Sequence, residues 1–554
     1  MKANHVVTNQ VPPLEGDDVA NYPPITEYLD RVGAGDSLPE VHEIGQMAGS
    51  GEWITVGDLA EEHSPILETH DRYGNRVDLV RYDPSYHRLM DTAVSYGMAG
   101  RPWAVDDPHA HLVRSAKFSV WASVDAGHGC PISMTYAVVP ALRHNPELAA
   151  QYEPGLTSLV YQPELSVPTA KAGLIAGMSM TEKQGGSDVR ANTTTAVAQS
   201  DGSYLITGHK WFTSAPNSDL LLVLAQTPGA GSGASGPNVA EGLSCFFVPR
   251  ILPDGSRNNI FLQRLKNKLG NHSNASSEVE YHDAVGWMVG EPGRGVRTII
   301  EMVNMTRLDC ATASAAVMRN GTTAAAHHAA YRSAFGKRLV DQPLMANVLA
   351  DLHTEAEAAT LTALWLADLT DRALHDEQAA QLRRISLAVS KYFICKRAPM
   401  HAAEALECLG GNGYVEDSRM PKLFRESPLM SIWEGSGNVA ALDTLRAIGR
   451  EPQTLAVLFD EFDSAAGSDR VYDDALRTLK DAFTDPESLE YRARHLVGQM
   501  ATLLSASLLI RHGHPAVADA YVRSRLDGSW GAVYGTLGDG VDTAAIIARA
   551  TPKV

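Results

Sequence analysis

Positive charge is scarce in this chain of 554 residues. Lysine and arginine together number 47, against 65 aspartate and glutamate residues, so the formal net charge is −18. A field of that sign repels a phosphate backbone, and any contact with nucleic acid requires a local basic patch to overcome it. The composition therefore gives no support to a nucleic-acid-binding role for the chain as a whole.

Cysteine is also scarce, and its spacing argues against a disulfide framework. The cysteines are dispersed, odd in number, and no two form a Cys-x-x-Cys pair. That pattern fits a reducing cytoplasm. We expect no metal site, and we expect at least four of the cysteines to be small buried side chains. The cysteines are Cys130, Cys245, Cys310, Cys395 and Cys408.

Long apolar runs are absent. No run of 18 apolar residues is present, and the opening MKANHVVTNQVPPLEG lacks the basic and apolar regions of a signal peptide. Hydrophobic residues make up 44% of the chain and charged residues 20%, as in an ordinary soluble protein. We expect a cytoplasmic protein without a membrane span, and the length allows about three or four domains.

The first part of the chain divides into an arm and a helical region. Residues 1–40 are rich in Pro, Asn, Gly and Asp, which is typical of an arm that is loosely structured on its own. From there to about residue 170 the pattern is mostly helical. Within it, the long apolar stretch His109–Leu142 predicts a buried helix.

The hydrophobic period changes in the middle of the chain. Residues 190–290 carry strand signals, and alternating Thr193, Thr195 and Val197 before the turn at Asp201 predict a hairpin. The composition of Pro228–Pro237 predicts a flexible loop. Further short strands are predicted at Leu220–Ala225, Cys245–Val248 and Glu278–Tyr281.

The helical period returns after Gly293 and continues to the end. Apolar residues recur at spacings of three and four from Leu344 to Leu366, which predicts one face of a long helix. No Gly-x-Gly-x-x-Gly follows a predicted strand, which weakens a Rossmann interpretation. The predicted fold is mainly α with an inserted β domain. The predicted domains are 1–175 (arm and helical domain), 176–290 (β domain), 291–449 (helical bundle) and 450–554 (an extra helical domain).

Five short motifs contain residues suited to binding a large polar cofactor. Glycines let a backbone approach a phosphate, an arginine fork suits a pyrophosphate, and an aromatic residue beside hydroxyls suits a flat polar ring. Each motif alone also fits an ordinary loop, strand end, helix terminus or cap. The motifs are TEKQGGSD (181–188), KWFTS (210–214), RSAFG (332–336), LGGNGY (409–414) and IWEGSGN (432–438).

The last motif contains the strongest candidate for a catalytic group. Glu434 lies between Trp433 and Gly435 in an otherwise apolar stretch. Burial there would raise the pKa of the carboxyl group and make it a better base near neutral pH. The alternative is a glutamate at a helix start, stabilised by the helix dipole.

The five motifs, in this order, resemble those of the acyl-CoA dehydrogenase superfamily. The resemblance covers roughly residues 80–450 and includes LKNKLGNHSNASSEVEYHDA (265–284) and MTRLDCA (305–311). TEKQGGSD, SIWEGSGN, HGCPISMT and GHKWF look most like the AidB-type branch, as do the long amino-terminal arm and the extra carboxy-terminal region. The resemblance implies a helical domain, a β-barrel-like middle domain and a helical bundle, with FAD bound between them in a homotetramer.

The resemblance also implies roles for particular residues. The isoalloxazine ring and its ribityl chain would contact Met180, Thr181, Ser187, Trp211, Phe212, Thr213 and Ser214. The pyrophosphate and adenosine, expected to be those of a neighbouring subunit's FAD, would be held by Arg332, Phe335, Gln342, Gly410 and Gly411, and the site would be closed by Ser436 and Asn438.

Glu434 matches the base of the family, which removes the α proton of an acyl thioester while the β hydride moves to flavin N5. Some members place their base just before the arginine of the MTR-like segment. Here that position is Thr306, whose hydroxyl cannot serve as this base. The sequence therefore predicts an FAD-dependent dehydrogenase acting on a small acyl-CoA or a related substrate.

Two other functions remain open on sequence grounds. One is a DNA-associated flavoprotein that protects against alkylation damage, with weak DNA binding through the carboxy-terminal domain. That region has eleven basic and fifteen acidic residues from Arg450 onward, with local basic spots at Arg492 and Arg494 and at Arg523 and Arg525. The interpretation we favour for those spots is a solvated helix surface. The other function is a flavin oxidase acting on a nitroalkane, against which Glu434 argues, because that branch is expected to use aspartate.

Overall fold

The computed structural model describes residues 4–227, 242–483 and 488–553, so the predicted loop 228–237 lies outside the described residues. The chain forms two compact units. The helical unit comprises residues 1–54, 111–123 and 307–554, and the β unit comprises residues 55–110 and 124–306. No helix among the described residues is long and apolar enough to cross a membrane.

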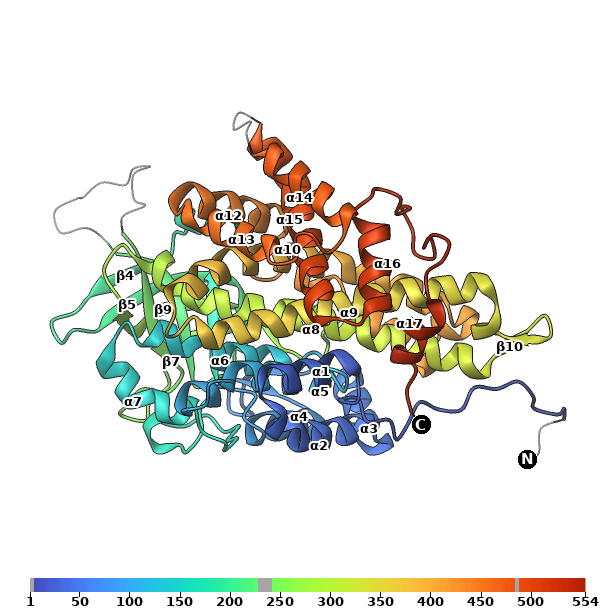
Figure 1. The fold of residues 1–554 in the computed structure, drawn as a ribbon. Helices are drawn as coiled ribbons and strands as arrows, with labels where there is room; N and C mark the ends of the chain where they lie inside the picture. Colours follow the sequence, from blue (N-terminus) through green and yellow to red (C-terminus); the bar gives the residue numbers. More distant parts are fainter. Residues whose placement is uncertain (1–3, 228–241, 484–487, 554) are drawn as a thin grey trace. The chain divides into compact units, whose positions relative to one another are not determined.

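The β unit is built on seven strands that pair in the order β3-β5-β4-β6-β7-β9-β8. Figure 1 labels β4, β5, β7 and β9 of this sheet. Additional pairings of β3 with β6 and of β5 with β9 close five of the strands into a ring. The β6 strand, LLLVLAQ, is apolar almost throughout and buried at every position, as expected for a strand covered on both faces. The strands are β3 Ala176–Thr181, β4 Thr195–Ala198, β5 Tyr204–Ser214, β6 Leu220–Gln226, β7 Leu243–Pro249, β8 Ile260–Leu265 and β9 Ser276–Val289.

The remaining elements of the β unit are mostly helical. They include α4 Pro84–Ser95, α6 Gly129–Leu142 and α7 Pro146–Leu156. Helix α6 is buried almost all round and packs against β3 and α7. Its amino-terminal end lies close to the loop before β9. A Cβ atom added to Gly127 would lie only 1.9 Å from Ser273 Oγ.

Three sequence expectations for the amino-terminal region were wrong in detail. His109–Leu142 is two helices, α5 Ala110–Trp121 and α6, because the chain turns between them, where Asp125 accepts a hydrogen bond from the His128 amide. Within the expected loose arm, α1 Pro23–Val32 is an ordered helix that buries Ile25 and Leu29.

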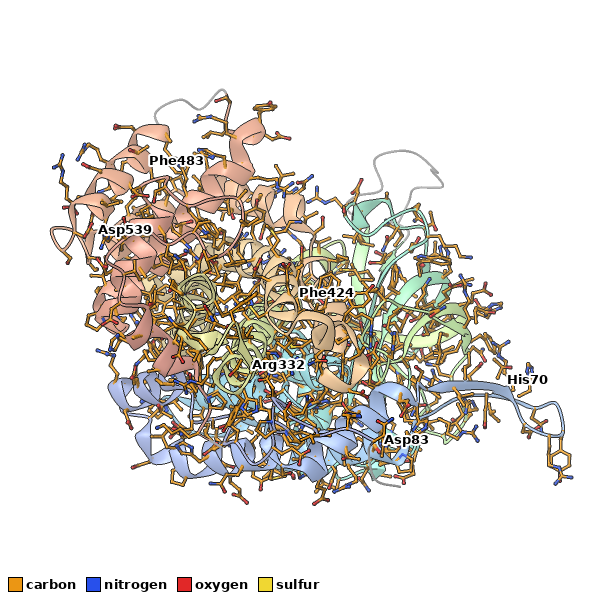
Figure 2. All side chains as sticks on the ribbon, turned by 90° about the vertical axis from the view of Figure 1, so that its right-hand side faces the viewer. His70, Asp83, Arg332, Phe424, Phe483 and Asp539 are labelled. Carbon is orange, nitrogen blue, oxygen red and sulfur yellow. The ribbon has the colours of Figure 1, made fainter. Side chains whose placement is uncertain are left out.

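The third difference is a β hairpin in the region expected to be helical. Strands β1 Ile66–His70 and β2 Arg76–Arg81 pair antiparallel, and Figure 2 shows His70 near the outer end of the hairpin. The turn is held by Asp71, whose carboxylate accepts hydrogen bonds from the Tyr73 and Asn75 amides. The short polar strands give little period-2 signal, which explains why the hairpin was missed.

The helical unit is centred on two long antiparallel helices. These are α9 Pro343–Arg372, whose predicted apolar face is confirmed, and α10 Glu377–Glu407. The helices after residue 450 pack against α9 and α10 within the same unit. The other helices of 7 residues or more that lie wholly in this unit's described residues are α1, α2 Leu38–Gly49, α11 Met420–Glu426, α12 Gly437–Arg450, α13 Gln453–Asp463, α14 Arg470–Ala482, α15 Leu489–His512, α16 Pro515–Arg525 and α17 Thr543–Ala550. Helix α5 starts at Ala110 of the β unit and continues in this unit. Helix α3 Gly51–Glu62 and helix α8 Gly295–Tyr331 continue from one unit into the other.

Helix α9 carries buried carboxylates that pair with arginines from the carboxy-terminal region. Arg525 of α16 lies 2.5 Å from Asp351 and 3.1 Å from Glu355, and all three side chains are at least 96% buried. The Arg525 guanidinium also lies 4.2 Å from the ring of Trp530. These contacts attach the last part of the chain to the centre of the helical unit.

Removing the Arg525 charge should therefore destabilise the protein. We expect Arg525→Met to lower the free energy of unfolding by about 3–5 kcal/mol, because it leaves the buried Asp351 without its cation and Glu355 with Arg397 alone. Arg523→Met is the matched control two residues earlier: its pair with Asp519 is about half exposed and contributes less than about 1 kcal/mol. Denaturant unfolding followed by circular dichroism compares the two, and equal losses would contradict this account.

Candidate functional site

The TEKQGGSD motif follows β3 and is anchored by one glutamate. Glu182 is fully buried and its carboxylate accepts hydrogen bonds from Lys210 Nζ (2.8 Å), from the Thr193 amide (2.7 Å) and from the Thr194 amide (3.0 Å). Gln184 Nε2 donates to the same carboxylate at 2.7 Å. The loop between β3 and β4 is therefore fixed from inside by a single side chain.

The pKa values of Glu182 and Lys210 are both shifted by burial and by their pairing. Burial alone would raise the pKa of Glu182, but the charge and hydrogen bond of Lys210, together with Thr193 and Thr194, outweigh it and hold that pKa far below its ordinary value. Burial lowers the pKa of Lys210 to about 8 in spite of its partner. The carboxylate is therefore ionised in the folded protein at every ordinary pH.

The KWFTS motif forms the end of β5, next to β3. Thr181 is paired with Phe212, and Met178 with Ser214, so the first two motifs lie side by side on neighbouring strands. Phe212 is 50% exposed and Ser214 is half-buried, whereas Thr213 between them is fully buried. Thr213 and Ser214 pair in regular register with Ser179 and Met178, so their side chains present opposite faces, and the exposed Phe212 lies where the register is irregular.

The Thr213 hydroxyl already has partners inside the sheet. It lies 2.6 Å from Ser179 Oγ, to which the Tyr281 hydroxyl donates at 2.8 Å. Trp211 is half-buried, and the Lys266 ammonium lies 3.2 Å from its ring centroid. Of the predicted residues of this motif, Phe212 thus offers an exposed ring, and Ser214 offers a half-buried hydroxyl on the face opposite to Thr213.

The remaining predicted residues of the β unit lie at the end of β3, in the loop after it and in helix α8. Met180 and Thr181 at the end of β3 are half-buried, and Ser187 is exposed in the loop that Glu182 anchors. Thr306 is buried and its hydroxyl donates to the Val303 carbonyl at 3.0 Å, which is a bond within its own helix. Its position therefore offers no side-chain base.

Glu434 lies in the helical unit, on the turn between Ser431 and α12. Its backbone has φ +57°, in the left-handed region that a residue with a side chain seldom adopts. The Glu434 carbonyl accepts a hydrogen bond from Arg307 Nε at 3.0 Å. The carbonyls of Trp433 and Gly435 accept from Lys391 Nζ at 2.6 and 2.5 Å. Ser436 and Asn438, at the start of α12, are exposed.

The arginine and glycine motifs also lie in the helical unit. Phe335 is completely exposed at the turn between the two short strands Ser333–Ala334 and Lys337–Arg338. Arg332 donates to the Asn9 carbonyl at 2.6 Å, and Gln342 donates to the Ala334 carbonyl at 3.0 Å.

The paired glycines begin a 3-10 helix that follows α10. Gly410 has φ +61°, which favours glycine, and a Cβ at Gly410 or Gly411 would meet nothing within 4 Å. A phosphate-sized group can therefore approach this backbone without a steric clash.

Four buried charged residues that contact the candidate motifs were not predicted from the sequence. They are the buried cations Arg307, Lys210 and Lys391, together with Glu182. Lys391 stands in the apolar run SLAVSKYFIC, and a lysine inside such a run was the available signal.

Each arginine of the two predicted basic spots has a hydrogen-bond or ion-pair partner, although Arg494 and Arg523 are exposed. Arg525 is buried in its ion pairs, and Arg523 pairs with Asp519. Arg494 donates to the Tyr392 hydroxyl, and Arg492 to Ser488. The expectation of a solvated helix surface was therefore wrong for Arg525, whose guanidinium is buried and not accessible to DNA.

The chain matches three family descriptions along its length. They are the N-terminal domain of the adaptive response protein AidB over residues 9–163, the acyl-CoA dehydrogenase middle domain over residues 177–284 and the acyl-CoA dehydrogenase C-terminal domain over residues 293–449. AidB of Escherichia coli strain K12 is 42% identical over 528 residues, which cover 94% of each chain.

Two solved structures extend the comparison. ACDH-11 of Caenorhabditis elegans, in complex with C11-CoA, is similar with a TM-score of 0.84 and 26% identity, covering 99% of this chain and 93% of that one. An acyl-CoA dehydrogenase of Bacillus anthracis complexed with FAD has a TM-score of 0.60 and 17% identity, covering 84% and 79%, and shares the fold alone.

The fold and these matches define a flavoprotein of the acyl-CoA dehydrogenase family, whose members are oxidoreductases acting on CH–CH groups. Within that family, the chain belongs to the AidB-type branch.

The anchoring of the TEKQGGSD loop predicts an acid-sensitive contribution to stability. We expect Glu182→Gln to lower the free energy of unfolding at pH 7 by about 3–5 kcal/mol, because Lys210 is left buried without its carboxylate. Since the pKa of Glu182 is lowered on folding, the wild-type advantage is present above the unfolded value of about 4.3 and is lost as the pH falls below it.

Urea unfolding of the two proteins between pH 7 and pH 3 measures this difference. A wild-type advantage that stays constant over the whole range would contradict the assignment of the lowered pKa to Glu182.

Proposed function

We propose that the protein is an FAD-dependent acyl-CoA dehydrogenase in which Glu434 is the catalytic base. The observation that carries the proposal is the backbone at Glu434. It is held in a rarely adopted conformation, and two buried cations bind the carbonyls of residues 433, 434 and 435. A stored strain of this kind persists only where surrounding contacts fix it, and it is concentrated at functional sites.

Each unit, taken by itself, offers residues that suit a part of FAD. Phe212 offers a half-exposed aromatic ring and Ser214 a half-buried hydroxyl at the end of the same strand, which fits the flat, polar isoalloxazine. We assign Met180, Thr181 and Ser187 to the same end of the cofactor. Gly410 and Gly411 leave open backbone for a pyrophosphate, with Arg332, Phe335 and Gln342 as further contacts and with Ser436 and Asn438 closing the site.

The chemistry requires one base and one acceptor. Glu434 removes the α proton of an acyl thioester, and the turn that carries it keeps the carboxylate in one place during the transfer. FAD, when bound, supplies the hydride acceptor for the β carbon. The remaining task of the protein is to hold the thioester so that its α carbon faces Glu434.

An acyl-CoA is the substrate class we propose. The AidB-type family membership supports it, and the relative ACDH-11 was solved with C11-CoA. The described cysteines are all buried and free, which fits a reducing compartment, and we infer a cytoplasmic location.

We further propose that copies of the chain associate, as a homotetramer. Three large apolar side chains of the helical unit support this: Phe335 is 100% exposed, Leu344 82% and Tyr414 82%. Phe335 and Tyr414 belong to the two motifs assigned to the adenosine end of FAD. Exposed aromatic residues of this kind mark surfaces that bind a partner or ligand, so we assign these motifs to the FAD of a neighbouring subunit.

Replacing the base should separate catalysis from cofactor binding. We expect Glu434→Gln to slow reduction of the bound flavin by an acyl-CoA about 10²–10⁴-fold, because the amide cannot accept the α proton. The flavin should remain bound, since the amide preserves the size of the side chain. Anaerobic absorbance of the flavin after addition of isovaleryl-CoA or a longer thioester measures this, and a variant reduced as fast as wild type would remove Glu434 from the role of base.

The two hydroxyls of the KWFTS motif should behave differently. We expect Ser214→Ala to change the absorbance spectrum and affinity of the bound flavin, because Ser214 is half-buried on the face opposite to Thr213. Thr213→Val should leave both unchanged and lower the free energy of unfolding by about 1–3 kcal/mol, because it removes a buried hydrogen bond to Ser179. The opposite pattern would show that Thr213 is the residue that contacts the flavin.

A further inference from the structure

Three consecutive backbone carbonyls around the proposed base are bound by cations. Lys391 Nζ of α10 donates to the Trp433 carbonyl at 2.6 Å and to the Gly435 carbonyl at 2.5 Å. Arg307 of α8 donates from Nε to the carbonyl of Glu434 itself. One lysine thus binds the residues before and after Glu434, and α12, which follows this turn, packs along α10 (Figure 1).

The two cations are held in different ways. Arg307 also pairs with Asp443 of α12 at 2.7 Å, and Asp443 in turn pairs with Arg384 at 2.9 Å, so Arg307 belongs to a network of charges. Lys391 is 99% buried, and its ammonium group donates hydrogen bonds to two backbone carbonyls. Burying an ammonium group is costly unless its hydrogen bonds are satisfied, so these two carbonyls are what stabilises Lys391 in place.

The bonds from Lys391 matter because the backbone of Glu434 has an unfavourable conformation. Glu434 has a positive φ that is unfavourable for a residue with a side chain, and such a conformation persists only where surrounding contacts fix it. Gly435 follows with φ +106°, and a Cβ there would lie 3.0 Å from Val439. The direction in which the Glu434 side chain leaves the backbone therefore depends on the carbonyls at 433 and 435 staying where Lys391 binds them.

We propose that Lys391 is a positioning residue that sets the orientation of the Glu434 carboxylate through the backbone on both sides of it. Lys391 acts through the carbonyls and does not itself transfer a proton. This inference rests on the proposed function for its catalytic consequence, whereas its structural part, the fixing of the turn, stands on the contacts alone.

The test compares Lys391→Met with the matched control Lys480→Met. Lys480 is a surface lysine of α14 that pairs with Asp463, away from the proposed machinery. Flavin reduction by an acyl-CoA in a single turnover should slow about 100-fold in Lys391→Met and stay at the wild-type rate in Lys480→Met, with flavin still bound to both.

Amide hydrogen exchange gives a second readout that needs no substrate. Exchange in the segment 429–440 should become about tenfold faster or more in Lys391→Met and remain unchanged in Lys480→Met, since the substitution removes two charge-assisted hydrogen bonds from this segment. Lys391→Arg, which keeps the charge and several donors, should fall between Lys391→Met and wild type in both measurements, and it provides the comparison if Lys391→Met does not fold.

The outcomes separate the two proposals. A wild-type protein whose flavin no acyl-CoA reduces would contradict the proposed function, and hydrogen exchange would still decide whether Lys391 fixes the turn. Wild-type exchange in both Lys391 variants would overturn the inference. So would wild-type rates of flavin reduction in both variants, even with faster exchange.

Discussion

The hydrogen bonds from Lys391 to the carbonyls of residues 433 and 435 are the contacts on which the geometry of the candidate base depends. A buried lysine is costly, because water no longer solvates its charge. That cost is offset here by two short hydrogen bonds whose acceptors lie on either side of a residue with positive φ. The same two bonds thus offset the desolvation of the lysine and hold the strained turn in place.

The β unit uses the same principle at the other candidate motif. Lys210 is buried beside Glu182, and Glu182 accepts hydrogen bonds from backbone amides across the loop. In both places a buried lysine is bound to irregular backbone that carries proposed functional side chains, directly at Lys391 and through Glu182 at Lys210. Helix α9 shows a third use of buried charge, because its carboxylates attach the carboxy-terminal helices through Arg525 and Arg549. Two kinds of polar pairing, cation to carbonyl and cation to carboxylate, therefore hold together segments far apart in sequence.

Much of the fold was predictable from periodicity. The β block between two helical regions, the strands at Leu220, Cys245 and Glu278, and the long helix through Leu344–Leu366 all follow from the spacing of apolar residues. The β1–β2 hairpin and helix α1 were missed, because short or polar elements depend on tertiary contacts that leave no periodic signal. The four domain boundaries stay predictions.

The candidate site was predictable only as a set of motifs. The sequence pointed to Thr213 and Ser214 equally, and only the register of β5 against β3 shows that their hydroxyls face opposite sides. It likewise pointed to Glu434 through its flanking residues, but Lys391 lies 43 positions earlier in the chain and gave no motif. Long-range pairing of this kind is set by how α10 packs, which a single sequence does not encode in any local pattern.

The proposed reaction requires that a proton leaves the α carbon of an acyl thioester when the flavin is reduced. The most direct measurement is the single-turnover rate of flavin reduction in the wild-type protein with an acyl-CoA carrying deuterium at the α carbon, compared with the undeuterated thioester. We expect the flavin to be reduced by both thioesters and more slowly by the deuterated one, because the α C–H bond breaks before or as the flavin is reduced. Equal rates for the two substrates, or a flavin that stays oxidised at saturating thioester, would contradict it.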